Sequence, residues 1–130
     1  MPELLPSFAY LSSYDPPLPI IELVIANPSN QSVTTEVFIV DSGSDMTCIK
    51  DDIIGLLKLE FFGYATVAGD TGEEDDYQTA IVRIETPFGV HELTEVVIDS
   101  NTNENLLGRD VLNRWKVTLD GPNQQMTIEV

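Results

Sequence analysis

From residue 20 onward, short apolar runs alternate along the chain with clusters of Gly, Pro, Asn, Asp and Ser. Such runs, bounded by turn-forming residues, predict β-strands joined by tight connections. In the run 33–40, Val33, Thr35, Val37 and Ile39 share one face of the predicted strand. The predicted strands cover residues 20–25, 33–40, 46–50, 61–67, 77–85, 90–98, 116–119 and 126–130.

Helical periodicity is confined to short stretches. Residues 107–115 are the best helix candidate, because Val111, Leu112 and Trp115 recur at helical spacing. Residues 51–57 fit either a short helix or a turn, and residues 101–105 read as a loop. The predicted class is therefore all-β, a small closed barrel-like or sandwich fold with one short helix near the C-terminus.

The two ends of this pattern differ in character. Residues 1–19 are rich in Pro, Ser and Tyr and predict an extended or loosely ordered arm rather than a packed element. Residues 20–130 carry the strand pattern, and 130 residues suit one domain with a single core. The strands at 61–67 and 77–85 flank a polar, acidic, glycine-bearing segment, which predicts a long hairpin.

Composition narrows the classes of function. The chain has 22 acidic residues against 6 basic ones, a net charge of −16, which disfavours binding to nucleic acid or to an anionic membrane surface. No apolar run approaches the length of a membrane span, and the N-terminus does not read as a secretory signal, so a cytoplasmic location is expected.

A single cysteine, Cys48, and a single histidine, His91, argue against a zinc site and against a Cys–His or Ser–His hydrolase. Cys48 itself reads as a small buried hydrophobe.

The most informative segment is 37–49, Val-Phe-Ile-Val-Asp-Ser-Gly-Ser-Asp-Met-Thr-Cys-Ile. An apolar strand delivers Asp41 into a tight turn and a second apolar strand leaves it, which aims a carboxylate out of the core at a fixed point. Gly43 allows another backbone to approach closely. An isolated Asp-Ser-Gly is an ordinary turn, but the apolar residues on both sides and Thr47 make this one more specific.

This segment resembles the active-site segment of the retropepsin-like (retroviral-type) aspartic peptidases, where apolar residues precede Asp-Thr/Ser-Gly-Ala/Ser and a Thr or Ser follows. A second stretch, Leu106-Leu107-Gly108-Arg109-Asp110-Val111-Leu112, resembles the Gly-Arg-Asp/Asn motif that opens a helix near the C-terminus of these proteins. The two matches occur in the family's order. The resemblance covers residues 20–130 and leaves the arm outside.

The resemblance implies a homodimeric aspartic endopeptidase in which each copy supplies Asp41 as the catalytic residue. The hairpin at 66–76 would be the flap that closes over a polypeptide substrate, and the strand at 126–130 would contribute to a sheet between the two copies. No cofactor and no metal are expected. The other residues that the resemblance assigns are Gly43, Asp45, Ala68 and Gly69 for substrate binding, and Ser42, Thr47 and Arg109 as structural residues near the site, with Arg109 paired to Asp45.

A second triplet, Asp70-Thr71-Gly72, raises the alternative of a two-lobed enzyme with both aspartates in one chain. Too few residues separate the triplets to build another lobe, and acidic residues follow the second one, so we interpret it as a turn in the flap. One usable aspartate per chain then requires a symmetric dimer. Two close carboxylates share one proton, which predicts an acidic optimum.

Two other interpretations stay open at this stage. The fold could serve as a non-catalytic dimeric binding or scaffold module. The arm could also be a cleavable or exchanged segment in a larger processing system. The acidic flap departs from the apolar, glycine-rich flap typical of the family, and it predicts closure that is favoured at low pH.

Overall fold

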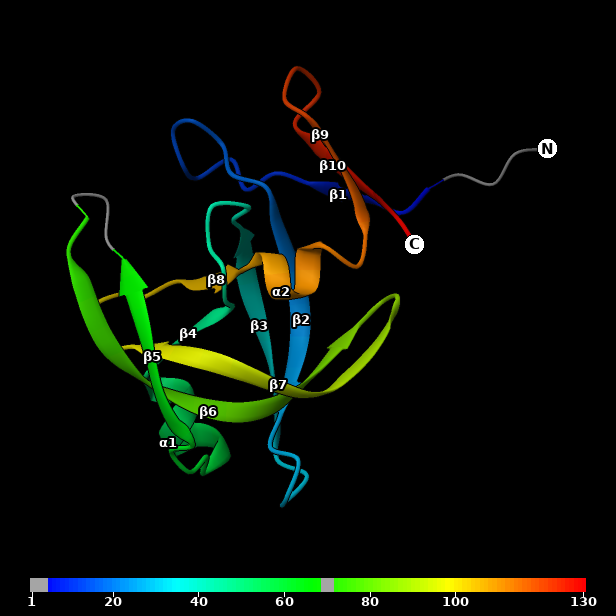
Figure 1. Ribbon diagram of the computed structural model, residues 1–130. Helices are drawn as coiled ribbons and strands as arrows, with labels where there is room; N and C mark the ends of the chain where they lie inside the picture. Colours follow the sequence, from blue (N-terminus) through cyan, green and yellow to red (C-terminus); the bar gives the residue numbers. More distant parts are fainter. Residues whose placement is uncertain (1–4, 69–71) are drawn as a thin grey trace.

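The computed structural model describes residues 5–68 and 72–130 of the chain. Strands dominate, and they form a seven-stranded sheet and a separate three-stranded sheet (Figure 1). The elements are β1 (Ser7–Ala9), β2 (Ile20–Ala26), β3 (Val33–Val40), β4 (Cys48–Lys50), α1 (Asp52–Leu57), β5 (Gly63–Ala68), β6 (Glu74–Thr86), β7 (Gly89–Asp99), β8 (Asn105–Leu107), α2 (Arg109–Leu112), β9 (Lys116–Asp120) and β10 (Gln125–Glu129).

The larger sheet closes into a barrel. Its strands follow the order β2-β3-β8-β4-β7-β6, and β6 pairs back onto β2 to complete a ring of six. The pairs β3–β8 and β4–β7 are parallel, and the other pairs in the ring are antiparallel. β5 lies outside the ring and forms a hairpin with the long strand β6. The closed barrel-like fold expected from the sequence is therefore confirmed.

Alternating side chains of the barrel strands fill its interior. In β2, Ile21, Leu23 and Ile25 are fully buried, as expected for one face of a half-buried strand. In β3 the buried side chain is Phe38, whereas Val33 and Val37 are exposed. The face of β3 that carries the regular apolar alternation thus points away from the core. Burial of each large apolar side chain contributes about 1.5–3 kcal/mol to the free energy of unfolding.

The helices differ from the prediction in number and length. The described residues contain two short helices instead of one, because residues 52–57 adopt the helical alternative. α2 spans only four residues, so the predicted helix at 107–115 is too long. Residues 105–107 instead form β8, which pairs with β3 and β4. Within the described ranges, neither helix has the length and apolar content needed to cross a membrane.

The three-stranded sheet ties the two ends of the chain together in the order β1-β10-β9. The arm is extended, as predicted, but the prediction that it is loose is wrong for residues 7–11. Its strand β1 pairs with β10, and Leu11 forms a bridge with Leu18. The Phe8 ring lies 6.3 Å from the Phe88 ring, between centroids, in an edge-to-face arrangement. Backbone pairing and this aromatic contact anchor the arm, and neither leaves a clear signal in a proline-rich sequence.

Candidate active site

Asp41 stands at the point where β3 leaves the barrel wall. Its backbone N–H donates to the carbonyl of Leu107 at 3.0 Å, and its carbonyl accepts from the N–H of Ser44 at 3.2 Å. The N–H of Gly43 donates to Asp41 Oδ1 at 2.9 Å. These contacts fix both the turn and the direction of the carboxylate. A Cβ added at Gly43 would lie 3.2 Å from Asp41 Oδ1, so a side chain there would crowd the carboxylate.

Arg109 braces the same turn from the other end of the chain. Its Nη1 donates to the Ser42 carbonyl at 2.7 Å, and its Nη2 forms an ion pair with the carboxylate of Asp45. The predicted pairing of Arg109 with Asp45 is therefore present. The Asp45 side chain is 83% exposed and that of Arg109 is 42% exposed. An exposed ion pair contributes about 0–1 kcal/mol, so its main effect is to position the turn rather than to stabilise the fold.

Thr47 forms a buried support below the turn. Its Oγ1 donates to Asp110 Oδ1 at 2.8 Å and accepts from the N–H of Gly108 at 3.1 Å. The Thr47 N–H donates to Asp110 Oδ2 at 3.0 Å. Asp110 therefore joins the turn to α2, a role that sequence reasoning did not assign to it. Its position directly after Arg109 in the second motif was the available signal.

Gly108 allows the two motifs to touch. A Cβ at this position would lie 2.6 Å from the backbone carbon of Met46 and 2.9 Å from the backbone nitrogen of Thr47. The next residue completes the contact, because the N–H of Arg109 donates to the Ser44 carbonyl at 2.8 Å. The close approach of two backbones explains why glycine is required here.

Cys48 lies next to this cluster, on β4. Burial raises the pKa of its thiol, which disfavours the thiolate that a nucleophilic cysteine needs. Its Sγ lies 3.5 Å from the Met46 carbonyl oxygen. These features support its interpretation as a half-buried structural residue.

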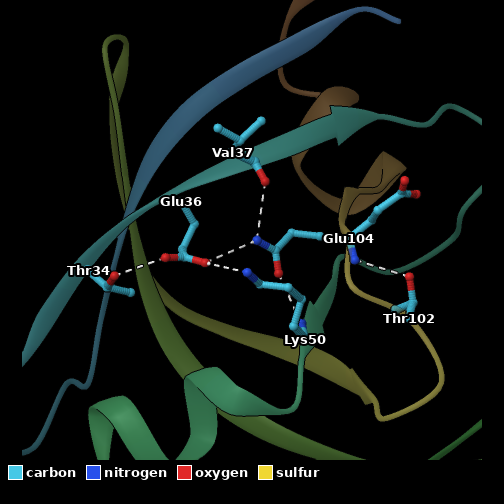
Figure 2. A network of polar contacts seen from close by, with 7 residues as sticks. Thr34, Glu36, Val37, Lys50, Thr102 and Glu104 are labelled. Carbon is cyan, nitrogen blue, oxygen red and sulfur yellow. Dashed lines mark hydrogen bonds and ion pairs between the residues drawn. The ribbon is translucent and has the colours of Figure 1, made fainter. Parts of the chain in front are cut away.

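A polar network on β3, β4 and β8 holds the strands on either side of the turn (Figure 2). Lys50 Nζ lies 3.3 Å from Glu36 Oε1, and the Glu36 side chain is only 15% exposed. Asn105 Nδ2 donates to the Val37 carbonyl at 3.2 Å, while its Oδ1 accepts from the Lys50 N–H at 2.9 Å. Hydrogen bonds to partly buried charged groups contribute about 1.5–3 kcal/mol each. The strand that the sequence analysis missed, β8, is thereby fixed beside β3.

The N-terminal arm also contacts the segment directly before β8. The hydroxyl of Tyr14 donates to the carboxylate of Glu104, directly before β8. Together with Ile20, Ile39 and other residues, these side chains line a cavity of about 420 Å³. The arm therefore forms part of the wall of this cavity, beside β3, the strand that directly precedes Asp41.

The predicted flap is the hairpin of β5 and β6, in which Ala68 pairs with Glu74. Gly69 and the first two residues of the second triplet, Asp70 and Thr71, lie outside the described residues. Near its end the hairpin is acidic, with Asp75 and Asp76 exposed and lining a cavity of about 630 Å³ together with Asp51 at the start of α1. The charge of Asp99 on β7 is the main factor that raises the pKa of Tyr77, with smaller effects from burial and from Asp75.

The sequence-predicted residues therefore divide into two groups. One cluster brings together residues from both motifs, namely Asp41, Ser42, Gly43, Asp45, Thr47 and Arg109. Ala68 lies on the hairpin, where it pairs with Glu74 of β6.

A closed six-stranded barrel that presents one carboxylate on a turn, braced by a Gly-Arg-Asp segment, defines the single-lobed aspartic peptidase type of fold. Residues 17–120 match the family model described as retroviral aspartyl protease, and the chain belongs to this family. The match covers most of the chain and includes both motifs.

Solved structures agree on the fold. One is the EIAV protease complexed with the inhibitor HBY-793, with a TM-score of 0.60 and 18% identity over 75% of this chain and 86% of that chain. Another is a retropepsin-like aspartic protease from Rickettsia conorii, with a TM-score of 0.63 and 13% identity over 96% of this chain and 91% of that one. At these identities the likeness shows the fold alone. No curated protein sequence gives a significant match.

Proposed function

We propose that this protein is an aspartic endopeptidase that acts as a homodimer, with one Asp41 carboxylate from each copy. The observation that carries the proposal is the brace around Asp41. The Gly43 N–H donates to the Asp41 carboxylate, Arg109 donates to the carbonyl of Ser42 in the same turn, and the buried Thr47 joins the segment after the turn to Gly108. A turn that served only to reverse the chain would need no such support.

The chemistry follows from two carboxylates placed close together. Because both cannot be charged cheaply at such short range, the pair holds one proton between them. The ionised carboxylate acts as general base on a bound water molecule, and the protonated one polarises the carbonyl of the scissile bond. These steps use only the two Asp41 side chains and water.

The pairing within the flap supports the need for a second copy. Ala68 of β5 pairs with Glu74 of β6, so only residues 69–73 lie between the two strands of the hairpin. This length is too short for a second active-site lobe built around the second triplet. A charge of −16 per copy opposes association, so the dimer fraction is expected to rise with salt.

The test is digestion of a peptide library from about pH 3 to about pH 7, with an acidic optimum expected for the wild type. Asp41→Asn should abolish cleavage while circular dichroism and sedimentation match the wild type. Asp70→Asn is the matched control and should retain cleavage. A folded, dimeric wild type that cleaves nothing at any pH would instead identify a binding or scaffold module.

A further inference from the structure

One buried polar side chain, Asn105, belongs to the short strand β8 beside the Asp41 turn. It is 3% exposed and bonds to both neighbouring strands. Its Nδ2 donates to the Val37 carbonyl on β3 at 3.2 Å, and its Oδ1 accepts from the Lys50 N–H on β4 at 2.9 Å. A side-chain amide carries both a donor and an acceptor, so this one residue ties β8 to two strands at once.

β8 depends on such ties because its own backbone pairing is short. Its three residues pair in parallel with residues 38–40 of β3, and one of them also pairs with Cys48 of β4. Asn105 is the first residue of the strand and Leu107 is the last. The Leu107 carbonyl accepts from the Asp41 N–H at 3.0 Å. The position of β8 therefore influences the direction in which the Asp41 turn begins.

A charged pair fixes the orientation of the Asn105 amide. Its Nδ2 lies 3.5 Å from Glu36 Oε1, and Lys50 Nζ lies 3.3 Å from the same oxygen. Figure 2 shows Glu36 directed toward Lys50, with Thr34 donating to the other Glu36 oxygen at 3.0 Å. A reversed amide would set its oxygen against the Glu36 carboxylate and the Val37 carbonyl, which are both acceptors. The network therefore selects the orientation that ties β3 to β4 through β8.

A second asparagine of the same kind lies at the opposite end of β3. Asn27 is 7% exposed, donates to two carbonyls at the C-terminal end of α1 at 3.0 and 3.2 Å, and accepts from a backbone N–H at 2.8 Å. It follows β2, whose last residue pairs with Val33 at the start of β3. β3 has eight residues, so its two ends lie about 23 Å apart. The two asparagines thus form comparable buried networks, and of these two it is Asn105 that adjoins the Asp41 end.

We propose that Asn105 is a positioning residue for catalysis, which holds β8 at the spacing from β3 that directs the Asp41 carboxylate toward its counterpart. The inference rests on the proposed function and adds a residue that lies outside both sequence motifs. Asn105 acts through the Leu107 carbonyl and the Asp41 N–H. Catalytic groups have to be held to within about 0.5 Å of the productive geometry, so a small shift of β8 lowers kcat without unfolding the chain.

The test compares Asn105→Ala with Asn27→Ala in the full chain. Both substitutions remove a buried amide that makes three polar contacts, so both should lower the melting temperature to a similar extent. Peptidase kinetics are measured well below the lower melting temperature, at a concentration where sedimentation gives the same oligomeric state for all proteins. Asn105→Ala should lower kcat at least about tenfold with little change in KM, whereas Asn27→Ala should keep the wild-type kcat. Wild-type kcat in Asn105→Ala, or an equal loss in both variants, would overturn the proposal.

Asn105→Asp keeps the shape of the side chain and covers the case in which Asn105→Ala does not fold. A protonated carboxyl has one donor and one acceptor, so it can replace both amide bonds, whereas the ionised form only accepts. Glu36 and Lys50 are the charged side chains of the neighbouring strands that face this position. Burial and the Glu36 charge should raise the pKa of the introduced carboxyl, and the Lys50 ammonium, which already pairs with Glu36, opposes this in part.

The ratio of kcat in Asn105→Asp to kcat in the wild type should therefore be highest at the acidic end of the pH profile and fall as the pH rises. Asn27→Asp is the matched control, and its kcat ratio should stay constant with pH. A constant ratio in Asn105→Asp, or parallel falls in both variants, would contradict the positioning role.

Failure of this inference differs from failure of the proposed function. An active wild type whose kcat is insensitive to both Asn105 variants refutes the positioning role and leaves the peptidase standing. A wild type that cleaves nothing at any pH refutes both.

Discussion

Replacing Thr47 by valine removes one hydroxyl and leaves the shape of the side chain nearly unchanged. The hydroxyl is fully buried and carries two hydrogen bonds, one donated to Asp110 Oδ1 at 2.8 Å and one accepted from the N–H of Gly108 at 3.1 Å. The variant leaves the N–H of Gly108 buried without a partner, a cost of about 1–3 kcal/mol, and removes a bond to a carboxylate. Asp110 keeps its bond from the Thr47 N–H at 3.0 Å. We therefore expect a loss of about 3 kcal/mol in the free energy of unfolding.

Urea denaturation measures this loss, at one fixed protomer concentration because the proposed dimer would contribute to stability. The melting temperature should fall by about 10 °C. Thr47→Ser keeps the hydroxyl and should recover most of the stability. Thr35→Val is the matched control, because Thr35 is exposed on β3. It should change the free energy of unfolding by less than about 0.5 kcal/mol. If Thr47→Val is as stable as Thr35→Val, the buried support under the Asp41 turn has been misread.

Three further variants test other parts of the structure. Gly108→Ala places a Cβ 2.6 Å from the backbone of Met46. It should therefore lower the free energy of unfolding in urea denaturation by about 1–3 kcal/mol or more. An unchanged free energy of unfolding would contradict the close approach of the two backbones. Arg109→Lys keeps the charge but loses the planar fork that holds Ser42 and Asp45, so kcat should fall at least about tenfold while the melting temperature changes little; unchanged kcat would refute the brace. Burial, with a smaller effect from the charge of Arg114, lowers the pKa of His91, so the folded protein binds this proton more weakly than the unfolded chain. This contribution to stability is fully present above the ordinary histidine pKa of about 6.5 and is lost as the pH falls towards the lowered pKa. The melting temperature of the wild type should therefore fall with pH in this range, and it should fall less steeply in His91→Gln.

Much of the barrel could be predicted from the sequence because its strands alternate with strong turn signals. The hairpin of β5 and β6 and the strands β2 and β3 lie close to their predicted positions. β8 could not be predicted, since its three residues are extended only by pairing with β3 and β4, which are distant in sequence. Leu107 was assigned to a helix that proved to be shorter, and Asn105 was assigned to a loop.

The same distinction holds for the site. The turn at Asp41 and its ion-pair brace follow from two local motifs, so the pairing of Arg109 with Asp45 could be anticipated. The Glu36–Lys50 pair depends on where separate strands meet, and no local pattern marks those two positions. Asp110 lies in the second motif, but its bond to Thr47 depends on where the two motifs meet in the fold. β1 was missed for a similar reason, because a proline-rich arm forms a strand only where β10 offers it an edge.

The most direct test of the central claim mixes wild-type protein with the Asp41→Asn variant at a constant total concentration, well above the dimer dissociation constant, and measures peptidase activity. If each site needs Asp41 from both copies, random exchange at equal amounts leaves only wild-type pairs active, and activity should fall to about a quarter of that of pure wild type. If each chain catalyses alone, activity would fall to about a half. A value near one half, with subunit exchange verified, would contradict the shared dyad.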